Sequence, residues 1–213
     1  MSRRDTTRAL GRHFARFVTD VVVPRPVLWR VFRPLVRRQF DSLAPEWNAM
    51  RGGDTFAAYE RALDAVRKPP QRALDLGTGT GIGAFAIARR FPAADVVGAD
   101  LSERMIDEAR RLAPPDLRAR VRFDVADASK LPYEDGAFDL VALANMIPFF
   151  DELERVVARG GRVLVFFSSG PSTPIYVSDE RLRAELERRG FAEFADFTDG
   201  AGTALLARNQ ATA

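Results

Sequence analysis

Residues 73–83 constrain the fold more than any other part of the chain. An apolar run passes directly into a turn with glycines at positions 77, 79 and 81, and a helical pattern begins at about Ile82. Glycine adopts backbone conformations that other residues avoid, and it lets the main chain approach a ligand closely. In open α/β sheets, ligands bind where a strand ends and turns into a helix. The stretch therefore predicts an α/β fold with a binding site at this turn.

Strand-like and helix-like segments alternate from residue 71 to the end. We expect strands at 72–76, 95–99, 121–125, 138–143, 162–167, 191–198 and 203–207, and helices at 82–90, 102–112, 150–158 and 178–189. Such alternation is typical of a mainly parallel sheet covered on both faces. Two consecutive strands around Asp199-Gly200 predict an antiparallel hairpin at one edge. The fold expected is a Rossmann-like, doubly wound sheet of seven strands.

Local signals set several of these boundaries. Ser102 is expected to cap the helix that follows it. Gly190 should end the last helix. Gly160 and Gly161 are expected to form the turn before the strand at 162–167.

The chain divides at Lys68-Pro69-Pro70, and the part before it reads as helical. One apolar face runs from Leu10 to Val21 and is ended by Pro24 and Pro26; a second covers 27–36 and is kinked or interrupted at Pro34; a third covers 55–66. We expect residues 1–70 to form a helical extension or lid, and residues 71–213 to form a cofactor-binding domain.

Charge is distributed unevenly along the chain. Residues 1–40 hold ten arginines and two aspartates, a net of +8, so the remainder carries −5 of the total of +3. This segment fits a lid, a helix packed on the domain or across a homodimer, or a basic arm on an anionic membrane. It lacks the interleaved aromatics of a nucleic-acid surface. No apolar run reaches the roughly 18 residues of a membrane span. We expect a cytoplasmic monomer or homodimer, with peripheral membrane contact as an alternative.

The residues that are missing exclude several chemistries. The chain has no cysteine and one histidine, which leaves no thiolate nucleophile and no cysteine-based metal site, and no metal is expected. A P-loop is excluded because no Gly-Lys-Ser/Thr occurs.

Three acidic residues are predicted at the same edge of the sheet. Asp75 precedes the first glycine, Asp100 ends the second strand, and Asp127 follows the third. A carboxylate at Asp75 would repel a pyrophosphate but suits a cationic ligand. Doubly wound folds place a carboxylate such as Asp100 on ribose hydroxyls. Asp127 can accept a hydrogen bond from an adenine amino group.

Residues 71–167 resemble the class I S-adenosylmethionine-dependent methyltransferases, and most closely the small-molecule group that includes quinone-ring methyltransferases. Four stretches carry the resemblance in order: 75–81, an acidic loop of the form Asp-x-Gly-x-Gly-x-Gly; 98–105, ending in Met105; 127–141; and 156–163, in which Arg159 stands where many members have proline.

The resemblance implies a role for each cofactor residue. Gly77 and Gly79 would hold the methionine part of the cofactor, in a loop that includes Thr78 and Gly81, and Asp75 would act near its amino group. Asp100 would bind the ribose, Leu101 and Met105 would flank the adenine, Asp127 would take the adenine amine, and Ala128 would contribute its backbone. Asn145, after the fourth strand, completes the set.

Three other interpretations stay open. A nicotinamide dehydrogenase needs the motif G-x-G-x-x-G. If the motif starts at Gly79, Ala84 stands at the position of its third glycine. This interpretation leaves Asp75 unexplained, and the chain has no Tyr-x-x-x-Lys pair. A methyltransferase that acts on the exocyclic amines of bases would need a short loop after the fourth strand in which proline directly follows Asn or Asp. Here two residues separate Asn145 from Pro148, so the loop differs. A catalytically silent cofactor-binding or partner subunit would keep the same fold.

The sequence does not identify the methyl acceptor. Methyl transfer from a sulfonium needs positioning more than a protein nucleophile. A hydroxyl acceptor would need a general base, for which the candidates are His13, Tyr133 and Asn145. Trp47 and Tyr59 are further candidates for lining the acceptor site. A carbon or nitrogen acceptor would need less from the protein.

Overall fold

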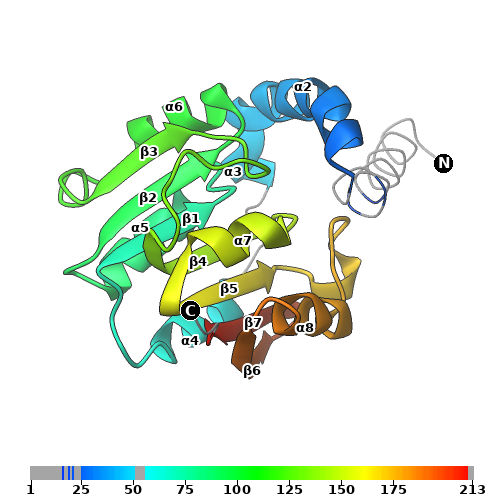
Figure 1. Ribbon diagram of the computed structural model, residues 1–213. Helices are drawn as coiled ribbons and strands as arrows, with labels where there is room; N and C mark the ends of the chain where they lie inside the picture. Colours follow the sequence, from blue (N-terminus) through cyan, green and yellow to red (C-terminus); the bar gives the residue numbers. More distant parts are fainter. Residues whose placement is uncertain (1–15, 17–18, 20, 22–24, 51–55, 211–213) are drawn as a thin grey trace.

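The computed structural model describes residues 16, 19, 21, 25–50 and 56–210. Within them, helices lie on both faces of one seven-stranded sheet (Figure 1). The strands are β1 (Arg72–Leu76), β2 (Asp95–Asp100), β3 (Val121–Val125), β4 (Phe138–Ala144), β5 (Val157–Phe167), β6 (Phe191–Asp199) and β7 (Gly202–Asn209). The main helices are α2 (Pro26–Leu43), α4 (Ala57–Asp64), α5 (Ile82–Arg90), α6 (Glu103–Leu112), α7 (Phe150–Val156) and α8 (Asp179–Glu187).

The strand order is β3-β2-β1-β4-β5-β7-β6, which confirms the doubly wound sheet. The first five strands are parallel, and β7 runs antiparallel between β5 and β6. The predicted terminal hairpin is therefore present, with its second strand inserted next to β5. The chain winds outward from β1 in one direction and from β4 in the other, so their carboxyl ends flank the point where such folds bind ligands.

Each face of the sheet has its own hydrophobic core. Along β5, Leu164 and Phe166 face a core with α4, α5 and α6, while Val163, Val165 and Phe167 face a core with α7 and α8. This alternation follows from the two-residue period of a strand, and continuous burial on both faces is typical of a central parallel strand. The sheet is thus a rigid support for the loops at its carboxyl edge.

The N-terminal elements lie across that edge. Figure 1 shows α2 on the side toward which the parallel strands point, beside α6. The 3₁₀ turn Ala44–Glu46 and the short helix α3 (Trp47–Met50) follow it. The inner face of α2 packs around buried Trp29, with half-buried Leu28, Phe32 and Val36. This face positions α2 over the binding region.

Helix α2 continues through Pro34, so of the two expectations, a kink or an interruption, the interruption is wrong. Proline removes one hydrogen bond and costs about 3 kcal/mol inside a helix. The inner face of α2 is packed on both sides of the proline, by Trp29 and Phe32 before it and by Val36 after it. This packing stabilises the helix where the backbone hydrogen bond is missing.

The start of the fifth strand also differs from the one expected. Strand β5 begins at Val157, before the two glycines that were expected to form a turn; Gly160, at φ +76°, lies inside it, and its pairing with β4 shifts between Phe138 and Leu140. A left-handed glycine absorbed as a bulge lets the strand continue. The predicted cap Ser102 is confirmed, since its side chain accepts a hydrogen bond from the Met105 amide. Ser178 caps α8 in the same way, through the Arg181 amide.

Some predictions lie outside the described residues. Most of the expected helix from Leu10 to Val21 does, and so does His13. The boundary near residue 70 stays a prediction, although α4, which precedes it, packs in the same core as α5.

Candidate cofactor-binding site

The turn after β1 is built from left-handed glycines. Gly77, Gly79 and Gly81 have φ of +72°, +53° and +91°. The amides of Gly77 and Thr78 both donate to the carbonyl of Ala99, at 2.8 and 3.0 Å, which fixes the turn against the end of β2. Side chains other than glycine are strained in this conformation. The sequence GTGTG therefore gives a tight turn whose backbone lies at the carboxyl edge of the sheet.

Asp75 organises the turn from inside the protein. It is buried, and its Oδ2 accepts a 2.6 Å hydrogen bond from Thr78 Oγ1. A Cβ at Gly83 would lie 2.6 Å from Asp75 Oδ1, so a glycine is needed where α5 begins. Asp75 lies inside the protein, on the side of the turn that faces α5. It is not among the described residues that line the cofactor cavity.

Asp100 ends β2 and faces the turn. Its Oδ2 accepts from the Gly79 amide and its Oδ1 from the Ser102 amide, each at 2.9 Å. Burial raises the pKa of Asp100, and the amides of Ser102, Gly79 and Leu101 oppose that rise. Each carboxylate oxygen has a second acceptor position, so the group can accept hydroxyl donors from a ligand as well.

A cavity of about 160 Å³ brings together most of the predicted cofactor residues. Its lining includes Gly77, Gly79, Asp100, Leu101, Met105, Ala128 and Asn145. The remaining predicted residues, Asp75, Thr78, Gly81 and Asp127, are not among the described lining residues. A glycine turn that lines the cavity, a carboxylate and flanking apolar side chains fit the methionine, ribose and adenine parts of S-adenosylmethionine.

Two side chains cover the turn in this structure. A Cβ built on Gly77 would lie 2.3 Å from Met146 Sδ, and one on Gly79 would lie 3.2 Å from Trp47 Nε1. Small-molecule sites usually measure about 300–1,000 Å³, so the cavity is smaller than a whole cofactor requires. Met146 and Trp47 therefore occupy part of the space that a whole cofactor would need. Trp47 was a candidate for the acceptor site, whereas nothing in the sequence indicated Met146.

Asp127 is held by helix α2. Its Oδ1 accepts from Trp29 Nε1 at 3.0 Å and from the Ser129 amide at 2.9 Å, and its Oδ2 accepts from Arg33 at 2.8 Å. Burial opposes ionisation of this carboxyl, but the bonds from Arg33, Ser129 and Trp29 outweigh it and lower the pKa of Asp127. No sequence signal joins Trp29 and Arg33 to a residue more than ninety positions away.

The catalytic candidates are not brought together. Tyr133 donates to Asp124 Oδ2 at 3.0 Å and packs against Phe138, and burial raises its pKa. Asn145 lines the cavity, but its side chain ties the end of β4 to β5: Oδ1 accepts from the Ser168 amide at 2.8 Å, and Nδ2 donates to Ser168 Oγ at 3.1 Å.

Tyr59 lies in the hydrophobic core rather than at the cavity. It is fully buried and packs against Phe56 and Phe166. Burial, and then the charge of Asp75, raise its pKa. It is a packing residue, not an acceptor contact.

The fold and the turn together define the class of protein. A doubly wound sheet that carries a left-handed glycine turn after β1 and a carboxylate at the end of β2 is a Rossmann-like fold, a class in which ligands bind at this turn. Comparison with known proteins narrows the class. Residues 73–165 match the family model described as "Methyltransferase domain".

Curated relatives and solved structures agree with this match. The chain is 42% identical over 139 residues to the demethylmenaquinone methyltransferase of Thermus thermophilus, covering 59% of this chain and 62% of that protein. It is 35% identical to the malonyl-[acyl-carrier protein] O-methyltransferase of Halorhodospira halophila, covering 66% and 50%. The crystal structure of the [4+2]-cyclase SpnF superposes with a TM-score of 0.66 at 21% identity, covering 82% and 94%.

The chain belongs to the class I S-adenosylmethionine-dependent methyltransferases. It spans less than two thirds of the length of the curated relatives described above. These relatives act on different acceptors by name, and the structural neighbour is named a cyclase, so the fold alone does not fix the reaction.

Proposed function

We propose that the protein transfers a methyl group from S-adenosylmethionine to a small lipophilic acceptor. The observation that carries the proposal is the Asp100 carboxylate, which lines the same cavity as Gly77 and Gly79 of the glycine turn. The resemblance to quinone methyltransferases supports the small-molecule acceptor.

The bound cofactor would supply an activated methyl group on a sulfonium. The chain's own residues would bind and orient it. Asp100 would accept the ribose hydroxyls, the Gly77–Gly79 backbone would hold the methionine end, and Leu101 and Met105 would pack on the adenine. The cavity is mainly apolar, which excludes water from the reacting atoms.

The acceptor is proposed to bring its own nucleophile. Among the described residues that line the cavity, the titratable one is Asp100, and both of its oxygens already accept backbone amides. No histidine, lysine or tyrosine lines the described part of this cavity. A neutral hydroxyl acceptor would need a general base, so an acceptor that ionises by itself, such as a carboxylate or an acidic carbon, fits better.

We propose that α2 and α3 act as a lid on the cofactor cavity. Besides the bonds to Asp127, Arg37 of α2 pairs with Glu103 at 3.1 Å, and Asp41 accepts from Ser102 Oγ at 2.6 Å. Asn48 of α3 accepts from Thr80 at 2.6 Å. Ser102 and Thr80 are buried beneath these contacts, whereas Arg37 and Asn48 on the lid side are exposed. Opening of the lid would therefore let water replace the lid's polar groups on the domain surface.

Peripheral membrane contact is a second proposal, favoured by the outer face of α2. Val27, Val31 and Leu35 are spaced four residues apart and are 67%, 67% and 52% exposed. Exposed Arg30 and Arg38 lie on the same helix. Within the described chain, no helix is long and apolar enough to span a bilayer. An amphipathic helix of this kind binds anionic surfaces. Sedimentation with anionic vesicles tests it, and a Val31→Asp/Leu35→Asp variant should stay in the supernatant.

Turnover distinguishes an enzyme from a catalytically silent cofactor-binding protein. The protein would be incubated with S-adenosylmethionine and a panel of quinols, acidic carbon compounds and fatty carboxylates, and S-adenosylhomocysteine would be quantified by mass spectrometry. We expect product with at least one acceptor and none in the Asp100→Asn variant. Equal product formation by the variant would contradict the proposed role of Asp100.

A further inference from the structure

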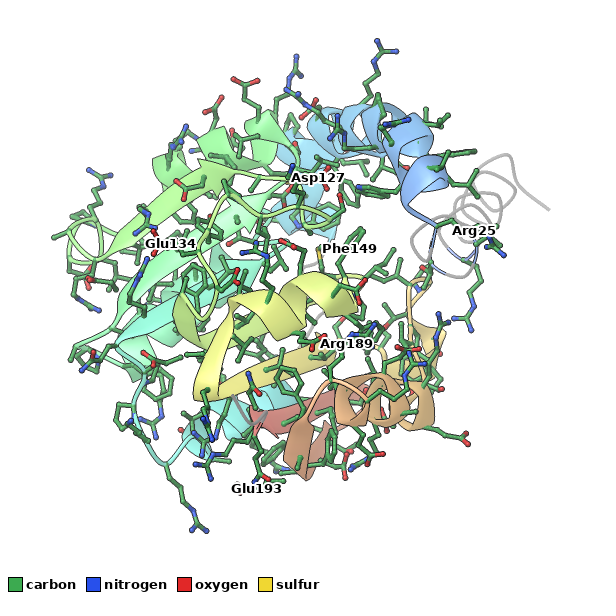
Figure 2. The ribbon with its side chains drawn as sticks, in the orientation of Figure 1. Arg25, Asp127, Glu134, Phe149, Arg189 and Glu193 are labelled. Carbon is green, nitrogen blue, oxygen red and sulfur yellow. The ribbon has the colours of Figure 1, made fainter. Side chains whose placement is uncertain are left out.

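A second cavity lies beside the cofactor cavity and measures about 640 Å³. It lies between α2, the loops after β3 and β4, α7 and α8. Figure 2 labels three of its lining residues, Asp127, Phe149 and Arg189, which follow one another from α2 toward α8. Its volume is within the range of small-molecule sites.

The two cavities share a wall. Trp29, Ile147 and Phe149 line both of them. The rings of Trp29 and Phe149 meet edge to face, with centroids 5.1 Å apart. A ligand in the second cavity is therefore separated from the cofactor cavity by side chains alone, and Trp29 belongs to the helix that the preceding section proposes as a lid.

The lining of the second cavity combines an apolar floor with a charged rim. Ile147, Pro148, Phe149, Phe150 and Val177 form the apolar part. Six cationic and four acidic side chains stand around it: Arg30, Arg33, Lys130, Arg181, Arg188, Arg189, Asp127, Asp151, Glu152 and Glu185. The rim therefore has a net charge of +2.

Each of the four acids is already paired with an arginine. Asp127 pairs with Arg33, Asp151 with Arg189, and Glu185 with both Arg188 and Arg189. Glu152 pairs with Arg155, which lies outside the lining. The acids consequently offer no free carboxylate to a cationic ligand.

Two cations remain for a ligand. Arg181 has an interaction partner of its own. The side chains of Arg30 on α2 and Lys130 after β3 are both exposed, and neither side chain forms an ion pair or hydrogen bond within the described part of the chain. An apolar floor beneath free cations suits a molecule with an apolar body and one acidic group, because the body is removed from water while the acid meets a guanidinium and an ammonium.

We propose that this second cavity binds an amphiphilic anion, and that the anion is the methyl acceptor or its precursor. The identification as acceptor rests on the proposed function, whereas the binding itself does not. An ionised acceptor also accords with the lack of a described general base in the cofactor cavity.

The test compares three probes with the same ten-carbon tail: decanoate, decan-1-ol and decyltrimethylammonium. Each is titrated into the full chain by calorimetry, with S-adenosylhomocysteine titrated in parallel. The variant is Arg30→Glu/Lys130→Glu, and its control is Arg89→Glu, which changes an exposed arginine outside both cavities. Circular dichroism establishes that each variant is folded.

We expect decanoate to bind at least about tenfold more tightly than decan-1-ol, since hydrogen bonds to charged groups are the stronger ones. Charge reversal at Arg30 and Lys130 should abolish that preference, and Arg89→Glu should keep it. Equal binding of the acid and the alcohol, or a preference unchanged in the double variant, would overturn the proposal. Decanoate binding without S-adenosylhomocysteine binding would keep the anion site and reject the proposed function.

Discussion

Replacing Arg33 with alanine should make the protein bind S-adenosylhomocysteine more tightly. Arg33 and Trp29 hold the carboxylate of Asp127, the residue that the family resemblance assigns to the adenine amine. If that assignment is right, the cofactor and α2 compete for the same two oxygens. Removing Arg33 weakens one competitor and leaves the carboxylate in place.

The size of the effect follows from the exposure of the pair. The Arg33 and Asp127 side chains are 44% and 16% exposed, with nitrogen and oxygen 2.8 Å apart. Solvent screens such a pair, so it contributes up to about 1 kcal/mol. Affinity for S-adenosylhomocysteine should therefore rise by up to about fivefold. This ligand is used because its sulfur is uncharged, so losing a cationic side chain does not alter binding through the sulfonium.

Arg37→Ala is the matched control, measured by the same calorimetric titration. Arg37 lies one turn further along α2 and pairs with Glu103 and Asp41, at 3.1 and 3.7 Å, without touching Asp127. We expect little change in this variant. An equal gain in both variants would show that a looser α2, not a freed carboxylate, raises affinity. No gain in Arg33→Ala would refute the competition at Asp127.

Three further outcomes are expected. Asp100→Asn should weaken S-adenosylhomocysteine binding at least about tenfold, judged by calorimetry on folded protein; undiminished affinity would place the ribose elsewhere. Gly77→Ala should lower the free energy of unfolding in urea by about 1–3 kcal/mol more than Gly200→Ala, because both are left-handed but a Cβ meets Met146 only at Gly77; equal losses would contradict a clash. The lowered pKa of Asp127 means that its ionised form stabilises the fold above its unfolded pKa, and that this contribution is lost as the pH falls below about 4. The Tm difference between the wild type and Asp127→Asn should shrink on acidification, and a constant difference would count against it.

The sheet and the glycine turn were predictable because the residues that determine each of them are close together in the sequence. Residues 72–76 and 121–125 match β1 and β3 at both ends, and Ser102 caps α6 as expected. Strand burial, capping and left-handed turns each depend on residues that are close together in the sequence. Asp100 was placed correctly at the end of β2 for the same reason.

The contacts across the cavity could not be predicted, because they join distant segments. The sequence shows that Trp29 lies on an apolar helix face, but not that its indole N–H reaches Asp127. The position of the Met146 side chain over Gly77 could not be predicted from the sequence, because a flexible side chain in a loop adapts to the packing around it. Pro34 indicated a break in α2 that packing on both sides of it prevents.

Titration of the purified protein with S-adenosylmethionine, S-adenosylhomocysteine and NAD tests the central claim most directly. The glycine turn, Asp100 and the apolar lining predict saturable heat with the first two ligands and none with NAD. Binding of NAD, or a folded protein that binds neither S-adenosylmethionine nor S-adenosylhomocysteine, would contradict the proposed cofactor site.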